Sequence, residues 1–214
     1  MNVLIACEES QRVCAAFRER GHNAFSCDLQ YPSGGFLGWH IKGDVLDILT
    51  APACFYTVDG SLHKIDKWDM IIAHPPCTVL SFAGNRALRD DVSGERHRKL
   101  NEASAFFMEF VKASEKCPRV CIENPLGWMS NLYRKPDQII HPYYFASPYD
   151  AENYVKKRTC LWLFGLPKLI YTPHAREPKS KWCETRVHHS DADRAKERSK
   201  TFTVIAEAMA NQWG

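Results

Sequence analysis

The chain has 214 residues, of which 45% are hydrophobic and 25% charged, and its formal net charge is +3. This composition excludes disordered, collagen-like and coiled-coil proteins and suits one compact domain with a sizeable core. We expect a cytoplasmic protein without membrane association, because the sequence has no basic leader and no run of eighteen apolar residues. The nine cysteines are scattered and odd in number, so we expect reduced thiols rather than a disulfide scaffold.

Short apolar segments alternate with helical patterns along the first half of the chain. This alternation predicts an α/β fold with a single, mostly parallel sheet flanked by helices. The expected strands cover residues 2–7, 23–27, 43–45 (the end of a third strand), 69–73, 119–123 and 159–164, and the expected helices cover residues 10–20, 99–115 and 202–213. Prolines follow two of these segments and are expected to end the strands there.

Three regions differ in composition. Residues 1–170 carry the strand and helix patterns and are expected to form the core. Residues 171–199 are rich in proline, histidine and charge and lack apolar periodicity, which predicts a small irregular insert. Residues 200–214 are expected to form a helix that packs back on the core.

Basic residues are clustered although the net charge is small. The clusters contain Arg86, Arg89, Arg96, Arg98 and Lys99; then Lys156, Lys157 and Arg158; then Arg176, Lys179, Lys181, Arg186, Arg194, Lys196, Arg198 and Lys200. Most such runs form solvated loops or helix faces, and acidic residues interrupt the last cluster. The clusters by themselves do not establish a nucleic-acid partner.

Polar residues gather where the predicted strands end. These ends carry Cys7, Glu8, Glu9, Asp28, Asp44, His74, Pro75, Pro76, Cys77, Glu123, Asn124 and Pro125. Open parallel sheets bind ligands outside the carboxyl ends of their strands. We therefore expect the functional site among these residues.

Asp28 closes the second strand, about twenty positions after the first strand ends. Nucleoside-binding folds place there the carboxylate that accepts the ribose hydroxyls. The glycine-rich turn that holds a pyrophosphate is absent, and Glu8 and Glu9 in its place would repel phosphates. The pattern favours a cofactor with a ribose but no phosphate, and S-adenosylmethionine, whose sulfonium is cationic, fits it.

Cys77 follows two prolines in the segment His-Pro-Pro-Cys-Thr at the end of a buried strand. A cysteine in a rigid turn near backbone amides and arginines can act as a nucleophile, although most lone cysteines are inert core residues. Glu123 ends the strand expected beside it and is its candidate partner, with a structural or helix-capping carboxylate as the alternative. A thiolate and a carboxylic acid together suit addition to carbon 6 of a pyrimidine with protonation of ring nitrogen 3.

These motifs resemble the DNA cytosine-5 methyltransferases, in particular the short members found in phages and prophages. Pro76-Cys77 resembles the proline-cysteine nucleophile motif, Glu123-Asn124 the glutamate-asparagine motif, and Lys157-Arg158 part of the glutamine-x-arginine-x-arginine strand. Gly43-Asp44-Val45 resembles the element that contacts the cofactor's adenine. The resemblance spans roughly residues 1–170 and implies a Rossmann-like class I S-adenosylmethionine-dependent methyltransferase with a very small target-recognition insert.

The resemblance also implies roles for individual residues. Cys77 would be the nucleophile, Glu123 the acid for ring nitrogen 3, Asn124 its positioner and Arg158 a contact to the base or the catalytic loop. The expected cofactor contacts are Cys7, Glu8, Ser10, Asp28, Asp44 and Pro75. No metal site is expected.

DNA is the expected partner. Residues 78–99 would form the loop that closes over an extruded base, with Phe82 and Trp128 available for stacking. The expected nucleic-acid contacts are Ser81, Arg86, Arg89, Arg98, Lys157, Lys179 and Lys181. Because the insert is too small for a core of its own, we expect a short or degenerate target site, with a second copy of the chain or a helper protein as ways to compensate.

The sequence departs from the family pattern at three places. Ala6-Cys-Glu-Glu-Ser10 replaces the glycine-rich first motif, Cys160 stands where a second arginine is usual, and Ser199-Lys-Thr-Phe202 stands in for the tenth motif. These departures keep two alternatives open: a methyltransferase for free cytidine nucleotides, and a catalytically silent nucleic-acid-binding module of the same fold.

Two further alternatives have less support. An amino-methyltransferase would need an aromatic residue after the two prolines, where this chain has Cys77. A zinc site could combine His74 with Cys77, or Cys183 with the histidines at positions 174, 188 and 189, but the chain has no paired Cys-x-x-Cys motif.

Overall fold

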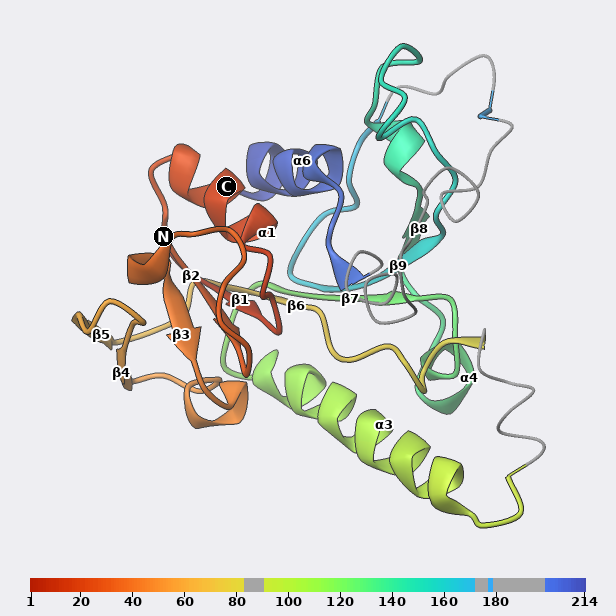
Figure 1. Cartoon of the computed structure of the whole chain (residues 1–214), viewed down its shortest axis with the longest axis horizontal. Coiled ribbons are helices and arrows are strands. Elements are labelled where there is room, and N and C mark those ends of the chain that lie inside the picture. Colours follow the sequence, from red (N-terminus) through yellow and green to blue (C-terminus); the bar gives the residue numbers. More distant parts are fainter. Residues whose placement is uncertain (83–90, 172–176, 179–198) are drawn as a thin grey trace.

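The computed structural model describes residues 1–82, 91–171, 177–178 and 199–214 of the chain. Its strands and helices form a layered α/β structure (Figure 1). The strands are β1 (Asn2–Ala6), β2 (Asn23–Asp28), β3 (His40–Lys42), β4 (Ala53–Tyr56), β5 (Leu62–Ile65), β6 (Met70–Ala73), β7 (Val120–Pro125), β8 (Gln138–Ile140) and β9 (Thr159–Phe164). The α-helices are α1 (Arg12–Glu19), α3 (Glu95–Ala113), α4 (Met129–Leu132) and α6 (Thr203–Trp213), and 3-10 turns cover Leu37–Trp39, Val45–Asp47 and Pro142–Tyr144.

A seven-stranded sheet with the order β3-β2-β1-β6-β7-β9-β8 forms the centre of the structure. The first five strands are parallel, whereas β9 runs antiparallel to both of its neighbours. The chain winds outward from β1 to β3 and then returns to the other side of β1 with β6. The winding therefore reverses between β1 and β6, and such a reversal is where open α/β sheets bind ligands.

Alternate residues of the central strands pack into two separate hydrophobic cores, because successive side chains of a strand point to opposite faces. On one face Leu4 packs with Phe107 and Phe110 of α3. On the other face Ile5 packs with side chains of α1 and α6, including Phe17 and Met209. Figure 1 shows α3 on one side of the sheet and α1 with α6 on the other. Each fully buried large side chain contributes about 1.5–3 kcal/mol, so the strand ends are held firmly.

The predicted α/β class, with a mostly parallel sheet flanked by helices, is confirmed. The predicted end of the third strand at 43–45 is wrong: β3 ends at Lys42, and Asp44 caps a 3-10 turn instead. The predicted end of the fifth parallel strand is also wrong, because Pro125 is the last paired residue of β7, opposite Thr159 of β9. A proline is tolerated at a strand end, where no ladder donor is required.

Helix α3 begins at Glu95, four residues before the predicted start at position 99. The carboxylate of Asp91 accepts hydrogen bonds from the amides of Arg96 and His97 at 2.8 and 3.2 Å. It thereby satisfies amides that the first turn of a helix leaves without partners. The loop predicted over residues 78–99 is correspondingly shorter.

Two features were not predicted from the sequence. The hairpin of β4 and β5 buries Phe55 and Ile65 and leaves the alternate positions exposed. Strand β8 has three residues and pairs only with β9. Both are too short to give a periodic pattern in the sequence.

The last helix, α6, packs against α1 (Figure 1). Most of the predicted insert, residues 172–176 and 179–198, lies outside the described residues. Within the part of the chain that the structure describes, no helix has both the length and the apolar character needed to cross a bilayer.

Candidate functional site

A cavity of about 600 Å³ lies at the carboxyl ends of β1, β2, β6 and β7. Lys157 and Thr159, around the start of β9, and the segment 199–201 before α6 also line it. This volume is typical of sites for small molecules. The sheet topology thus places the cavity where the winding of the chain reverses.

The turn after β1 brings two acidic residues to the cavity. Cys7 has a φ of 58°, a conformation that glycine adopts more easily than other residues. The buried carboxylate of Glu8 accepts hydrogen bonds from the amides of Val13 and Cys14 at 2.6 and 3.1 Å. These amides are the ones with which a helix N-terminus binds phosphate. The Glu8 carboxylate therefore occupies the position of an anion at the start of α1.

Burial shifts the titration of both residues in this turn. Burial raises the pKa of the Glu8 carboxyl above its ordinary value, although the charge of His74 and the two amide hydrogen bonds oppose the shift. Burial and the nearby charge of Asp28 raise the pKa of the Cys7 thiol far above its ordinary value. The Cys7 thiol is therefore protonated at neutral pH and unsuited to nucleophilic attack.

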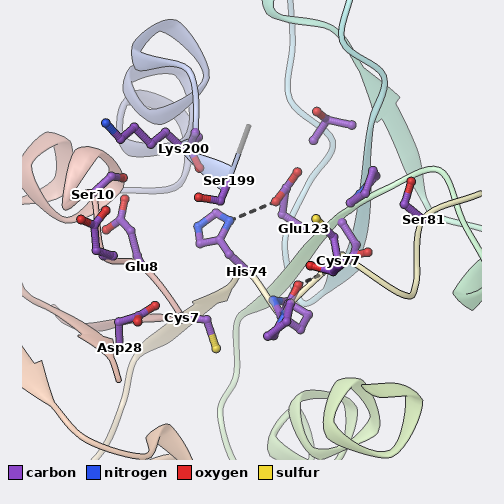
Figure 2. Close-up of a pocket in the computed structure, with 18 of the residues that line it drawn as sticks. Cys7, Glu8, Ser10, Asp28, His74, Cys77, Ser81, Glu123, Ser199 and Lys200 are labelled. Carbon is purple, nitrogen blue, oxygen red and sulfur yellow. Dashed lines mark hydrogen bonds and ion pairs between the residues drawn. The ribbon is translucent and has the colours of Figure 1, made fainter. Parts of the chain in front are cut away.

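Asp28 ends β2 and lines the cavity opposite the β7 side (Figure 2). Its Oδ1 accepts a hydrogen bond from the amide of Gln30 at 2.9 Å, which fixes the carboxylate at the strand end. Asp44, by contrast, does not line the cavity. Its Oδ1 accepts a hydrogen bond from the amide of Leu46 at 3.0 Å and caps a 3-10 turn.

Cys77 is half-buried and lines the cavity just beyond the end of β6. The loop that carries it is pinned to the segment after β7: Ser81 forms a β-bridge with Gly127. The amide of Trp128 donates to the carbonyl of Leu80 at 2.8 Å. A Cβ atom at Gly127 would overlap that same carbonyl oxygen, so only glycine permits the close approach.

The end of β7 is tied to the proline turn by side chains. The buried Asn124 amide donates to the carbonyl oxygen of Pro75 at 2.8 Å. Nδ1 of His74 lies 3.1 Å from Oε2 of Glu123. These two contacts join adjacent strands β6 and β7 and fix Cys77 and Glu123 at one cavity.

Glu123 is ionised in this arrangement. Burial opposes its charge, but the hydrogen bond to His74, the charge of His74 and the charge of Lys157 outweigh burial, so the pKa of the carboxyl is below its ordinary value. Lys157 lies just before β9 and lines the same cavity. The site therefore combines a thiol, a carboxylate, an imidazole and an ammonium group.

The structure brings most of the predicted site residues together. Those that line the cavity are Cys7, Glu8, Ser10, Asp28, Pro75, Cys77, Ser81, Glu123, Asn124 and Lys157. Figure 2 shows Cys7, Glu8, Ser10 and Asp28 on one side, Cys77, Ser81 and Glu123 on the other, and His74 between them. The predicted contacts Arg86, Arg89, Lys179 and Lys181 lie outside the described residues.

Arg158 and Arg98 do not line the cavity. Around the start of β9, Lys157 and Thr159 face the cavity, and the alternation of an extended chain turns the exposed Arg158 away. Its charge and the burial of His141 together lower the pKa of that imidazole. Arg98 is on α3, where it forms an exposed ion pair with Glu102 one turn away.

Phe82 and Trp128, the residues expected to be available for stacking on a base, pack edge to face on each other with ring centroids 5.6 Å apart. Neither residue lines the cavity. They stabilise the contact between the Cys77 loop and the segment after β7.

Sequence reasoning gave several residues in and around the site no catalytic or cofactor-binding role. His74 follows a buried strand directly, and this position at a strand end was the available signal. Ser199, Lys200 and Thr201 line the cavity from the segment suggested as a substitute for the tenth motif. Gly127 gave no signal, because its role depends on a contact between loops that are distant in sequence.

Among the described residues, no group of three or more histidine, cysteine, aspartate or glutamate side chains is arranged to hold a metal ion. Cys183 and the histidines at 174, 188 and 189 lie outside those residues. A comparison with protein-family models finds none that matches the chain, and a comparison with curated proteins finds no similar sequence.

Proposed function

We propose that this protein is a DNA cytosine-5 methyltransferase that uses S-adenosylmethionine. The observation that carries the proposal is the meeting of Cys77 and Glu123, from the ends of two adjacent strands, at one cavity that Asp28 also lines. Such a reaction has two ligands, the cytosine base and the cofactor. A nucleophile and a proton donor on one side of the cavity suit the base, and a carboxylate that would bind ribose on the other side suits the cofactor.

The cofactor side of the cavity fits S-adenosylmethionine. Asp28 lines the cavity at the end of β2 and would accept the ribose hydroxyls. Glu8 already occupies the amides at the start of α1, which disfavours cofactors with a pyrophosphate and leaves a nucleoside cofactor without phosphate as the better fit. When bound, S-adenosylmethionine supplies the electrophilic methyl group.

The strand order also supports the proposal. The five parallel strands β3-β2-β1-β6-β7 follow the order of a doubly wound nucleotide-binding sheet, and the antiparallel β9, with β8 beyond it, extends that sheet past β7. The reversal between β1 and β6 then separates a cofactor half on the β1–β2 side from a base half on the β6–β7 side.

The residues of the base half can divide the chemistry between them. The Cys77 sulfur would form a bond to carbon 6 of cytosine while Glu123 gives a proton to ring nitrogen 3, which makes carbon 5 nucleophilic. Asn124 would act indirectly, because its amide holds the carbonyl of Pro75 and thereby the turn before Cys77. After carbon 5 has taken the methyl group and lost its proton, the thiolate leaves.

A base within a duplex cannot reach a cavity between strand ends, so the target nucleotide would have to be extruded, at a cost of a few kcal/mol. Lys157 and Lys200 line the cavity and would provide positive charge for the phosphates beside that nucleotide. The very small target-recognition insert remains part of the proposal, with a short or degenerate DNA site.

Free cytidine nucleotides are the second candidate substrate. Arg98 and Lys99 of α3 each form an ion pair with a glutamate of the same helix, so their charges are partly compensated. A substrate held only inside the cavity would not need them.

Methyl transfer from labelled S-adenosylmethionine to duplex DNA, single strands and free cytidine nucleotides tests the proposal. We expect label at carbon 5 of cytosine in DNA, loss of that label with Cys77→Ala, and no loss with Cys54→Ala, whose thiol is exposed on β4. Transfer to nucleotides alone would support the second candidate. Binding of DNA without transfer to any pyrimidine would support a catalytically silent module and contradict the proposal.

A further inference from the structure

His74 lies at the centre of the cavity, between its two sides. Its ring lies between Glu8 and Glu123, with Ser199 beside it (Figure 2). Nδ1 is 3.1 Å from Oε2 of Glu123, and only 7% of the His74 side chain is exposed. A contact so shielded from water is stronger than a pair on the surface.

The second ring nitrogen distinguishes His74 from a histidine with a purely structural role. Nε2 is buried and has no hydrogen-bond partner among the described residues. Buried polar atoms of folded proteins nearly always have such a partner. The ring lines the cavity, and no structural contact of Nε2 within the described part of the chain accounts for its burial there.

The proposed reaction needs a carboxylic acid beside ring nitrogen 3, yet the pKa of Glu123 is below its ordinary value. Burial raises this pKa, but the hydrogen bond to His74 and the charges of His74 and Lys157 lower it by more. At neutral pH the carboxylate needs a proton donor of its own. His74 Nδ1 is the titratable group in contact with it.

We propose that His74 is a positioning residue that orients Glu123. It also supplies the proton that ring nitrogen 3 receives, by way of the Glu123 carboxyl group. This inference rests on the proposed function and deepens it. Histidine is suited to the task because an imidazole ring can both carry and give up a proton. Glu8 faces the ring from the other side, and its charge interacts with that of His74.

The proton transfers balance over one turnover. As the Cys77 sulfur bonds to carbon 6, a proton passes from Nδ1 of the imidazolium to the Glu123 carboxylate and from there to ring nitrogen 3, which leaves a neutral imidazole. After methylation, carbon 5 loses its proton to solvent. The electron pair of the broken carbon–hydrogen bond restores the carbon 5–carbon 6 double bond, and the carbon–sulfur bond breaks with its electrons going to sulfur. The proton on ring nitrogen 3 returns by the same route. The protein is unchanged, and one proton is released for each methyl group transferred.

Two substitutions test the inference. In His74→Asn the amide nitrogen takes the place of Nδ1, so Glu123 keeps a donor but loses the source of a transferable proton. We expect kcat to fall at least about 100-fold, as for loss of an acid–base group, with the KM for S-adenosylmethionine changed less than about threefold. His74→Ala should lose activity similarly and regain part of it when imidazole is added. His22→Asn is the matched control and should keep the wild-type rate, because His22 stands just before β2, at the opposite end of that strand from the cavity, and does not line it.

The outcomes distinguish this inference from the proposed function. A wild-type rate in His74→Asn, or a rise in KM with kcat unchanged, would overturn the role of His74 while leaving the methyltransferase proposal intact. Absence of methyl transfer by the wild-type protein would overturn both. Thermal unfolding checks that each variant is folded, and if His74→Asn is not, the rescue of His74→Ala by imidazole decides, with no regain of activity contradicting the role of His74.

Discussion

Replacement of Glu8 by alanine tests whether this carboxylate caps α1 in the way that a phosphate would in a nucleotide-binding protein. Glu8 is 4% exposed, and its oxygens accept from two buried amides at 2.6 and 3.1 Å. Gln11, at the N-cap position, gives the helix no side-chain hydrogen bond. Each buried donor without a partner costs about 1–3 kcal/mol, so the loss of both contacts in Glu8→Ala should lower the free energy of unfolding by about 2–6 kcal/mol.

Urea unfolding followed by circular dichroism measures this loss, with Glu8→Gln as the matched variant. Glutamine keeps one acceptor oxygen and removes the buried charge, so we expect at most about half of the loss seen with alanine. A Glu8→Ala protein within about 0.5 kcal/mol of wild type would refute the capping role.

The difference in unfolding free energy between wild type and Glu8→Gln should depend on pH with a definite sign. Burial raises the pKa of Glu8 in the folded state, so the folded protein holds this proton more tightly than the unfolded chain. The stability contributed by this tighter proton binding is complete below the pKa of Glu8 in the unfolded chain. It is lost as pH rises through the pKa of Glu8 in the folded protein. Relative to Glu8→Gln, wild type should therefore lose stability as pH rises across that interval, and an opposite slope would contradict the burial effect.

Three further predictions follow from contacts in and around the cavity. Gly127→Ala should displace the Cys77 loop, because the added methyl group overlaps the carbonyl of Leu80; we expect at least about 2 kcal/mol of lost stability and a lower kcat, and unchanged kinetics would refute the positioning role of this contact. Asn124→Ala should cost about 1–3 kcal/mol in urea unfolding, because it removes a buried hydrogen bond to Pro75; a change below about 0.5 kcal/mol would contradict it. Asp28→Ala should weaken S-adenosylmethionine binding in calorimetry at least about tenfold, the loss of one charge-assisted hydrogen bond, and an unchanged Kd would count against ribose recognition.

The sequence predicted the parallel part of the sheet and the edge that holds the site. Buried parallel strands have continuous apolar runs, and the residues after them, such as Cys77 and Glu123, can be identified directly. The same reasoning could not tell that Arg158 faces away from the cavity. A shift of one residue reverses the side to which a strand residue points, and the start of β9 has no apolar alternation that would show which residues face the cavity. The contact of His74 with Glu123 and the packing of Gly127 on Leu80 join segments that are distant in sequence, which no local pattern contains.

The central claim is that the sulfur of Cys77 bonds transiently to carbon 6 of cytosine. An oligonucleotide with 5-fluorocytosine at the target position, incubated with the protein and S-adenosylmethionine, should yield a stable conjugate, because fluorine at carbon 5 cannot leave as the proton does. Mass spectrometry of the digested conjugate should locate the nucleotide on the peptide that contains Cys77, and Cys77→Ala should form none. Methylation of ordinary DNA with no conjugate, or with one at another cysteine, would contradict the account.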